Sequence, residues 1–430
     1  MSDIIVYGKG KTGQNLVKML QKMGKNAVMY DDDTGFDGKG QFDKDTLVIV
    51  SPGVPPYAKG LDVAQKLGST VVGDLEFCFP YCRGRSISVT GTNGKTTTCE
   101  MIYHALKSND ISTRLLGNGG TPFSSQVLDV EPDETVVLES SSFQLKDCVC
   151  FAPYVSLFTN FASDHLNYHG SMQEYCEAKC KNFINQRNGV AIFNKDDTWV
   201  TEIAKKCSCK RLFYSLNNNE SNCYYDGTNV VLIDGTVKQV IQAKFLSEFA
   251  RHNLSNALGA ILACYCVGVS PQNVVESFKN YEFLPHRLQK VATIDGVTFI
   301  DDSKATNVHA TVSALGCFTH NLALILGGSD KGESYDAIFE NMKDNVGLVA
   351  AVGQTAEAIR SCGTKYGVAV NVFDDFREAT IFSYERLKHT QGTVIMSNAC
   401  ASFDKFGSYE ERGNYFQKVV KDIQSGKESN

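Results

Sequence analysis

The stretch VTGTNGKTTTCE, residues 89–100, joins two segments of different periodicity and decides how the chain is interpreted. SISVT (86–90) is typical of a buried strand, and TTTCEMIYHALKSN (96–109) has helical spacing. A glycine-rich turn between a strand and a helix directs backbone N–H groups inward, where they bind phosphate oxygens. In such a turn Lys95 can reach the β- and γ-phosphates, and Thr96 can offer its hydroxyl to Mg²⁺.

This stretch departs from the usual phosphate-loop pattern, G-x-x-x-x-G-K-[ST]. Gly94 and Lys95 match the end of the pattern, but Val89 stands five positions before Gly94, and the first glycine is Gly91. The shorter loop keeps every group that would touch phosphate. We therefore predict a nucleotide site here; the alternative is a glycine-rich turn without a ligand.

Length and composition indicate a soluble protein of several domains. The chain has 430 residues, which suggests about three domains at roughly 150 residues each. It contains no apolar run of about 18 residues, and MSDIIVYGKG at the start does not resemble a signal peptide. We expect a cytoplasmic protein without membrane insertion. The net charge of −6, without blocks of like charge, argues against a nucleic-acid partner.

The fifteen cysteines are scattered through the chain. Pairs such as Cys148/Cys150 and Cys207/Cys209 lack the C-x-x-C spacing of metal knuckles. We expect reduced thiols in a reducing compartment.

Strand-like and helix-like segments alternate along the chain, which predicts three α/β domains in series. Residues 1–82 are expected to form a Rossmann-like domain. Residues 83–284 are expected to form a domain similar to P-loop ATPases, with a parallel sheet. Two Asp-Gly steps in YYDGTNVVLIDGTV (224–237) predict a small antiparallel insertion in it. A second Rossmann-like domain is expected over 285–430.

GKGKTG (8–13) matches the G-x-G-x-x-G fingerprint between a strand and a helix, and Asp31 follows about twenty residues later. The pattern alone leaves three alternatives open: a nicotinamide dinucleotide, another anionic ligand, or a turn that needs glycine for its backbone geometry.

Polar side chains follow two further predicted strands. Glu139, in LESSSFQL (138–145), is a candidate Mg²⁺ ligand, and the alternative is a surface glutamate beside helix-capping serines. His165 and His169 have a spacing compatible with zinc, but no third ligand of zinc character lies nearby in the sequence. Lys179, taken alone, is typical of a solvated helix residue.

Four motifs collect cations and hydroxyl donors in the last third of the chain: HRLQKV (286–291), DDSKATN (301–307), LGGSDKG (326–332) and ACASFDKFGSYEERG (399–413). Such donors suit carboxylate and phosphate groups.

Together these motifs resemble the Mur ligase family, ATP-dependent enzymes that add amino acids to the peptidoglycan precursor. TGTNGKTTT (90–98) is similar to that family's form of the phosphate loop, and the resemblance runs from GKGKTG to YEERG (409–413). GKGKTG, SPG (51–53) and the ACAS segment are most similar to the members that add D-glutamate. The DNPR-type motif of the diaminopimelate- or lysine-adding members is absent. Asn398 is a departure, because D-glutamate-adding members usually have proline there.

The resemblance implies an amide-forming ligase that uses ATP, UDP-N-acetylmuramoyl-L-alanine and D-glutamate, with two Mg²⁺ ions. It implies that Lys95, Glu139, His165 and Lys179 carry the chemistry, with CO₂ converting Lys179 into a carbamate that binds metal. GKGKTG would then hold a uridine diphosphate sugar and not a nicotinamide. We expect a monomer.

The site residues that the resemblance implies fall into four sets. The nucleotide would contact Gly91, Thr92, Asn93, Gly94, Lys95, Thr96, Thr97, Asn253, Arg287 and Asp302. The UDP substrate would contact Lys11, Thr12, Asp31, Ser51, Pro52, Gly53 and Asn118. The amino acid would contact Lys304, Thr306, Lys331, Ser402 and Tyr409. The metal ions would be held by Thr96, Glu139, His165 and Lys179.

Overall fold

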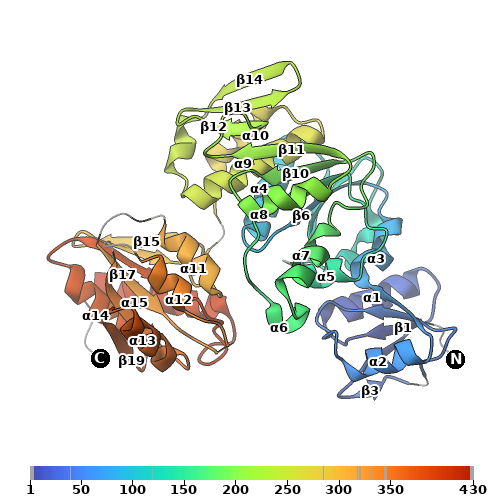
Figure 1. The fold of residues 1–430 in the computed structure, drawn as a ribbon, viewed down its shortest axis with the longest axis horizontal. Helices are drawn as coiled ribbons and strands as arrows, with labels where there is room; N and C mark the ends of the chain where they lie inside the picture. The colour runs from blue at the N-terminus through green and yellow to red at the C-terminus, as the bar shows by residue number, and fades with distance from the viewer. Residues whose placement is uncertain are drawn as a thin grey trace. The chain divides into compact units, whose positions relative to one another are not determined.

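The computed structural model describes residues 4–38, 40–118, 120–283, 285–316, 318, 321–330, 332–342 and 346–426. The chain divides into two compact units, Met1–Tyr281 and Glu282–Asn430. The first unit contains two sheets and the second contains one (Figure 1). Within the described ranges, every helix is too short or too polar to cross a membrane.

The N-terminal sheet has the strand order β3-β2-β1-β4-β5. All neighbours in it are parallel except β3, which pairs antiparallel with β2. Parallel order places the loops after β1, β2 and β4 at one edge, as in other α/β folds. The elements are β1 (Ile4–Tyr7), α1 (Lys11–Lys22), β2 (Val28–Asp31), β3 (Gly35–Phe36), β4 (Leu47–Val50), α2 (Lys59–Lys66), β5 (Thr70–Gly73) and α3 (Asp74–Cys78).

The central sheet has nine strands in the order β14-β13-β12-β11-β10-β9-β6-β8-β7. In this order the pairs from β7 through β11 to β12 are parallel, and β13 pairs antiparallel with both β12 and β14. The strands are β6 (Arg85–Thr90), β7 (Thr113–Gly117), β8 (Thr135–Glu139), β9 (Val155–Phe158), β10 (Val190–Asn194), β11 (Lys210–Ser215), β12 (Cys223–Tyr225), β13 (Asn229–Asp234) and β14 (Val237–Gln242).

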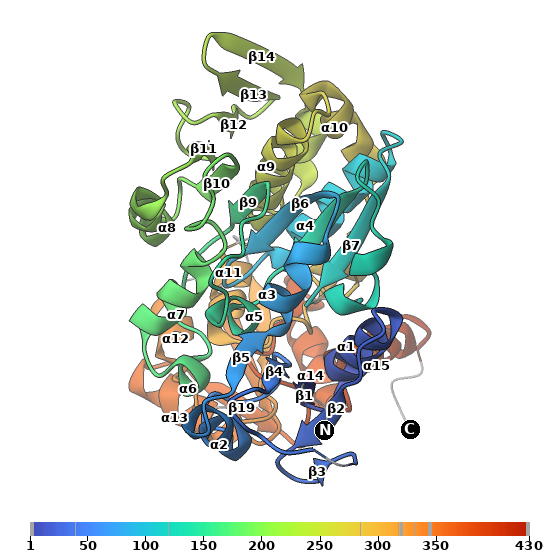
Figure 2. The ribbon, with the colours of Figure 1, turned by 90° about the vertical axis from the view of Figure 1, so that its right-hand side faces the viewer.

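The predicted antiparallel segment is confirmed, and it extends the edge of this sheet. Tyr214 of β11 pairs in parallel with Cys223 of β12, so the hairpin strands continue the same hydrogen-bonded surface to its edge (Figure 2). The helices of this region are α4 (Lys95–Lys107), α5 (Ser142–Lys146), α6 (Leu166–His169), α7 (Met172–Cys180), α8 (Thr198–Ile203), α9 (Arg251–Cys266) and α10 (Pro271–Ser277).

Helix α9 is buried because its sequence is apolar on nearly every side, as expected of a core helix. It contacts α4 and strands β9, β10 and β11. A Cβ on Gly259 would lie 3.2 Å from side-chain atoms of Leu157 and Tyr214, so glycine permits this close approach.

The two sheets of the first unit share one hydrophobic core. Val6 and Leu16 come from the N-terminal region, and Val136, Leu138 and Leu145 come from the central region. The position near residue 82, where the sequence suggested a domain boundary, therefore lies inside one compact unit.

The second unit is built on a six-stranded sheet of order β15-β16-β20-β17-β18-β19. Its first strand, β15, pairs antiparallel with β16 and was not predicted. The turn between them, Asp295-Gly296, has positive φ at both residues, which is the usual hairpin chemistry of an Asp-Gly step. The strands are β15 (Gln289–Ile294), β16 (Val297–Asp301), β17 (Leu322–Leu326), β18 (Val346–Val352), β19 (Val370–Phe373) and β20 (Gly392–Met396).

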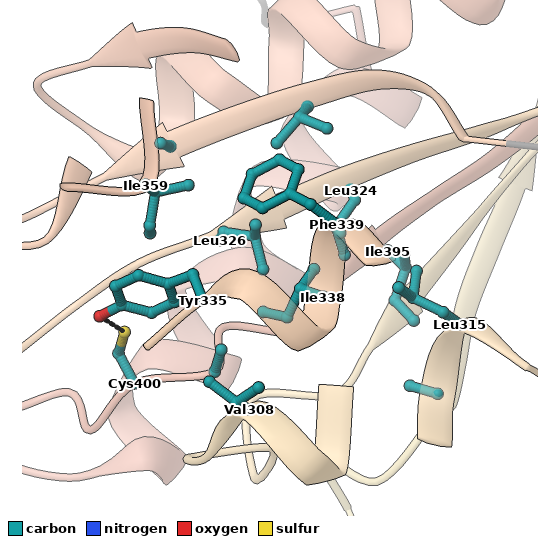
Figure 3. Close-up of a cluster of buried hydrophobic side chains, with 14 of the residues drawn as sticks. Val308, Leu315, Leu324, Leu326, Tyr335, Ile338, Phe339, Ile359, Ile395 and Cys400 are labelled. Carbon is teal, nitrogen blue, oxygen red and sulfur yellow. Dashed lines mark hydrogen bonds between the residues drawn. The ribbon is translucent and has the colours of Figure 1, made fainter. Parts of the chain in front are cut away.

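One core of this unit lies between the sheet and α12, where Leu324 and Leu326 meet Ile338 (Figure 3). At its rim the Tyr335 hydroxyl lies 3.3 Å from the Cys400 sulfur, which ties the loop after β20 to this core. The helices are α11 (Val308–Leu315), α12 (Asp336–Glu340), α13 (Ala356–Lys365), α14 (Phe376–Leu387) and α15 (Tyr409–Gln424).

Candidate active site

A cavity of about 800 Å³ opens in the first unit, where the loops that follow β1, β2, β4 and β7 meet. Its position fits the general rule that α/β sheets bind ligands beyond the carboxyl ends of their strands. Every residue predicted to contact the UDP substrate lines this cavity: Lys11, Thr12, Asp31, Ser51, Pro52, Gly53 and Asn118.

The glycines of GKGKTG shape one wall of this cavity. Gly8 has a φ of +99°, which favours glycine. A Cβ on Gly13 would lie 1.9 Å from the carbonyl oxygen of Gly8, so helix α1 can pack onto β1 only if residue 13 is glycine. Lys11 is held at the mouth, where its ammonium donates to the Gly120 carbonyl at 2.9 Å.

The phosphate loop has backbone angles that glycine adopts readily and other residues rarely adopt. Gly91 has a φ of +146° and Gly94 a φ of +81°. A Cβ on Gly91 would lie 1.9 Å from the Thr159 hydroxyl, and one on Gly94 would lie 2.6 Å from the Asn256 side-chain oxygen. The loop is therefore closely packed between β9 and α9.

Lys95 folds back over this loop, and its Nζ donates to the carbonyl oxygens of Gly91 at 3.0 Å and Thr92 at 2.8 Å. The hydroxyl oxygen of Thr97 is buried and has no hydrogen-bond partner among the residues that the structure describes. An unpaired buried hydroxyl next to a glycine-rich turn at a helix N-terminus fits a loop built to receive phosphate oxygens.

Two asparagines that sequence reasoning missed support the phosphate loop. Asn160 accepts from the backbone N–H of Asn93 at 2.8 Å and donates to the Asn93 carbonyl at 2.9 Å. Asn256 is buried one helical turn after the predicted nucleotide ligand Asn253, which is also buried. The HNLSN spacing in α9 was the available signal, since positions three apart share one helix face.

Glu139 connects the large cavity to the phosphate loop. It lines a smaller cavity of about 180 Å³ together with Thr96, the first-turn residue of α4. Asn118, in the large cavity, donates to the Glu139 Oε1 at 3.3 Å. Gly120 lines both cavities. A ligand in the large cavity and a phosphate at the loop would therefore meet beside the carboxylate of Glu139.

Lys179 is 1% exposed and therefore not the solvated helix residue that its sequence alone suggested. Its Nζ donates to the Gly91 carbonyl at 2.6 Å and lies 4.7 Å from the centre of the Tyr175 ring. Burial, followed by the charge of Lys95, holds the pKa of Lys179 well below its usual value. A neutral amine is a nucleophile, so Lys179 is chemically suited to add CO₂.

His165 and His169 differ sharply in environment. His165 precedes α6 with a φ of +54°, its side chain is 41% exposed, and its Nε2 lies 3.5 Å from Asp164. His169 is buried, its Nε2 lies 3.0 Å from the Ser142 hydroxyl, and burial lowers its pKa to about 4. The described residues contain no cluster of three or more His, Cys, Asp or Glu side chains that could hold a metal ion. Binding through Thr96, Glu139 and His165 would therefore depend on further oxygen ligands, such as a carbamate.

In the second unit the loops after β16 and β20 converge with the start of α15. The Lys304 ammonium lies 5.1 Å from the centre of the Tyr409 ring. The Ser303 hydroxyl donates to the Tyr409 carbonyl at 2.8 Å. Ser402 is buried in the loop after β20, and Thr306 lies just before α11. Four of the residues predicted to bind the amino acid are thus described; Lys331 lies outside the described residues.

The predicted nucleotide contacts of this unit lie at the same edge of its sheet. Asp302 accepts from the Ser397 hydroxyl at 2.7 Å and from the Leu288 N–H at 3.2 Å. Burial raises the pKa of Asp302 to about 7. Arg287 adjoins Leu288. Asn398, where the family resemblance led us to expect proline, is buried, and its side-chain amide has no hydrogen-bond partner within the described part of the chain.

Comparison with known proteins places these features in a family. The model of the Mur ligase middle domain matches residues 89–264, and the model of the Mur ligase glutamate ligase domain matches residues 286–399. The chain is 32% identical to a UDP-N-acetylmuramoylalanine–D-glutamate ligase of Pelotomaculum thermopropionicum, with 98% of each chain covered. It is 33% identical to the enzyme of the same name from Caldicellulosiruptor saccharolyticus, again with 98% of each covered.

Solved structures support the fold. The structure of MurF from Acinetobacter baumannii superposes with a TM-score of 0.62, at 17% identity, and covers 94% of this chain and 98% of that chain. At this identity the similarity concerns the architecture alone.

Proposed function

The chain belongs to the Mur ligase family of ATP- and Mg²⁺-dependent ligases of peptidoglycan synthesis, and we propose that it adds D-glutamate to UDP-N-acetylmuramoyl-L-alanine, giving ADP and phosphate. The observation that carries this proposal is the contact between Asn118 and Glu139, because it joins the large cavity to the phosphate loop. The named relatives support D-glutamate as the amino acid.

The proposed domain roles follow the three sheets. Residues 1–82 bind the UDP end of the substrate, 83–284 bind ATP, and 285–430 bind the amino acid. We propose that the protein acts as a monomer in the cytoplasm.

The first chemical step activates a carboxylate, which by itself is a poor acyl donor. The γ-phosphoryl group of ATP passes to the carboxylate of the L-alanyl group, giving an acyl phosphate and ADP. Lys95 neutralises negative charge on the transferred group, and the N–H groups of the glycine-rich loop orient it. Bound Mg²⁺, held by Thr96, Glu139, His165 and a carbamate on Lys179, would supply Lewis-acid stabilisation of the phosphate oxygens.

The second step forms the amide. The amine of D-glutamate attacks the acyl carbon, a tetrahedral intermediate forms, and phosphate leaves with the C–O bond electrons. Lys304, Thr306, Lys331, Ser402 and Tyr409 would hold the carboxylates of D-glutamate. Cationic and hydroxyl donors are the groups that bind carboxylates in proteins.

Phosphate release from ATP tests this function. The assay supplies UDP-N-acetylmuramoyl-L-alanine with D-Glu, L-Glu, L-Lys, meso-diaminopimelate or glycine, one at a time. We expect turnover with D-Glu alone, and loss of turnover in Lys95→Ala but not in Lys107→Ala, an exposed lysine of the same helix. Turnover with a different amino acid would keep the ligase reaction and refute the specificity. No turnover with any of them would refute the proposed function.

A further inference from the structure

Four of the described cysteines gather in one hydrophobic core beside helix α7, and none of the roles proposed above uses them. Cys180 and Cys207 are buried in this core, and Cys176 and Cys209 are partly buried and pack against it. The sulfurs of Cys176 and Cys180, here called the helix pair, lie 4.0 Å apart. Those of Cys207 and Cys209, the loop pair, lie 3.4 Å apart. All four are free thiols, and two thiols in contact are the groups that oxidation joins in a disulfide.

The helix pair lies in the same helical turn as Lys179. Helix α7 spans Met172–Cys180, so Cys180 is its last residue and Lys179 directly precedes it. The Lys179 Nζ donates to the Gly91 carbonyl of the phosphate loop at 2.6 Å. A change in the backbone of this turn therefore acts directly on the contact between Lys179 and the phosphate loop. The loop pair, in contrast, lies in the short link before β11 and adjoins no proposed site residue in the chain.

The two sulfurs of the helix pair differ in access to solvent. Cys176 is partly exposed, whereas Cys180 is 2% exposed. The hydrogen bond from Cys180 lowers the pKa of the Cys176 thiol to about 7; burial opposes this effect and the charge of Lys206 adds to it. The thiolate is the form of cysteine that reacts with oxidants. Cys176 is therefore suited to react first with a small oxidant from solvent, and Cys180 is placed to resolve the product.

A disulfide within the helix pair is incompatible with an intact last turn of α7. Residues four apart on a helix have Cβ atoms about 5–6 Å apart, but a disulfide requires about 3.5–4.5 Å. The sulfurs must also approach from 4.0 Å to about 2.0 Å. The last turn must therefore open when the bond forms. The helix can open there because Cys180 ends it and residues 181–185 continue as turns.

Resting on the proposed function, we propose that the helix pair is a redox switch, in which hydrogen peroxide forms a Cys176–Cys180 disulfide that opens the last turn of α7 and withdraws Lys179 from the phosphate loop. The Cys176 thiolate attacks one peroxide oxygen, the O–O bond breaks, and hydroxide leaves and takes up the thiol proton as water. The Cys180 sulfur then attacks the sulfenic sulfur, and the hydroxyl leaves with the second proton as water. The thiols lose two electrons, and the peroxide becomes two water molecules. A dithiol reductant reverses the change by exchange.

Peroxide treatment of the full chain tests this switch. The reduced protein is exposed to hydrogen peroxide, the remaining thiols are blocked with iodoacetamide, and disulfide-linked peptides are mapped by mass spectrometry. We expect a Cys176–Cys180 disulfide, a fall in turnover of about tenfold or more, and recovery with dithiothreitol. ATP affinity, measured by calorimetry, should also fall in the oxidised protein because Gly91 of the phosphate loop loses its contact with Lys179.

Cys176→Ala is the decisive variant because Cys176 is partly exposed and lies outside the proposed site. Without peroxide its turnover should lie within about twofold of the unaltered protein, and peroxide should not lower it, because the disulfide cannot form. Cys180→Ala should behave in the same way and replaces Cys176→Ala if that variant does not fold. The matched control is the double variant Cys207→Ala/Cys209→Ala, which removes the loop pair and should lose turnover on oxidation as the unaltered protein does.

Three results would overturn the switch. The first is an equal loss of turnover in Cys176→Ala, the second is a Cys176–Cys180 disulfide that leaves turnover unchanged, and the third is inactivation that accompanies only a different disulfide, such as one within the loop pair. If the reduced, unaltered protein shows no turnover with any amino acid, the proposed function fails. The disulfide map and the ATP affinity of the oxidised protein would still decide this inference, because neither measurement depends on the amino acid.

Discussion

Lys95 and Lys179 donate to the same oxygen: their ammonium nitrogens lie 3.0 Å and 2.6 Å from the carbonyl of Gly91. Two cations on one acceptor repel each other, and the buried one gives up its charge more readily. The charge of Lys95 accordingly contributes, after burial, to the lowered pKa of Lys179. The pair therefore makes the Lys179 amine easier to deprotonate, which favours its reaction with CO₂.

Carbamylation of Lys179 is the first prediction. Protein incubated with ¹³C-labelled bicarbonate should show one carbamate carbonyl resonance, because the neutral amine adds CO₂. Lys179→Arg should lack this resonance and lose about 100-fold or more in turnover, since guanidinium cannot form the carbamate. The control is Lys181→Arg, two residues along the chain. A resonance that persists in Lys179→Arg would contradict the assignment.

Removal of the buried amine should also affect stability. In CO₂-free buffer at pH 7, Lys179→Met should raise the free energy of unfolding by about 1 kcal/mol, because burial penalises the amine. The unfolded chain loses the Lys179 proton at about pH 10.4 and the folded chain loses it at a lower pH, so the unaltered protein gains stability as pH rises between these two pKa values. The advantage of Lys179→Met should therefore shrink towards pH 10. Urea unfolding at pH 7 and 9.5 measures the difference in free energy of unfolding between Lys179→Met and the unaltered protein, with Lys107→Met as the control. A difference that grows with pH would contradict the lowered pKa of Lys179.

Gly94 should not tolerate a side chain. Its φ of +81° costs other residues about 1–2 kcal/mol, and a Cβ would lie 2.6 Å from the Asn256 side-chain oxygen. Gly94→Ala is expected to weaken ATP binding at least tenfold by displacing the loop or Asn256. Gly316→Ala is the control, since Gly316 has helical φ and the nearest described atom to its Cβ would be the Ser313 carbonyl oxygen at 3.5 Å. Normal ATP affinity in Gly94→Ala, measured by calorimetry, would refute this role.

Asp32 anchors the N-terminal end of α2, accepting from the Tyr7 hydroxyl at 2.6 Å and from the Lys59 and Gly60 N–H groups at 2.9 Å. Burial raises its pKa, but these hydrogen bonds outweigh that effect and lower the pKa overall. The stability from ionised Asp32 is present above the unfolded pKa of about 3.9 and is lost as pH falls through the lower folded pKa. Asp32→Asn should lower the free energy of unfolding by about 1 kcal/mol at pH 7, and this loss should become smaller below about pH 3.9. Chemical denaturation at pH 7 and pH 3 measures the loss of stability in Asp32→Asn. A loss that increases on acidification would contradict the lowered pKa of Asp32.

Arg412 is a fully buried cation that joins two site loops of the second unit. Its guanidinium donates to the Ser303 hydroxyl at 2.9 Å and to the carbonyls of Cys400 and Ala401 at 3.1 and 3.2 Å. Arg412→Met should destabilise the protein by about 3–5 kcal/mol, because buried acceptors lose a charged donor. Differential scanning calorimetry measures this destabilisation, with Arg386→Met as the control because Arg386 is exposed. Equal melting profiles for the two variants would contradict this role.

The sequence by itself determined the local features of this protein. Gly91 and Gly94 have the positive φ angles that their loop requires, because backbone freedom is a property of the residue itself. Apolar runs such as the one in β17 determined where strands form and which of them are buried. The ends of those strands located the candidate site, since parallel strands bring their carboxyl ends to one edge.

Tertiary structure alone decided the environment of the side chains. The pKa of Lys179 is lowered because folding buries the side chain beside Lys95, and the neighbouring residues in the chain do not indicate that burial. The Asn256 side chain lies close to Gly94, although the two residues are 162 positions apart in the sequence. Asn118 follows β7 and donates a hydrogen bond to Glu139 at the end of β8. The pKa values and hydrogen bonds of these side chains depend on burial and on contacts between segments that lie far apart in the chain. The sequence could therefore identify the reactive groups, but only the fold decided how they are arranged.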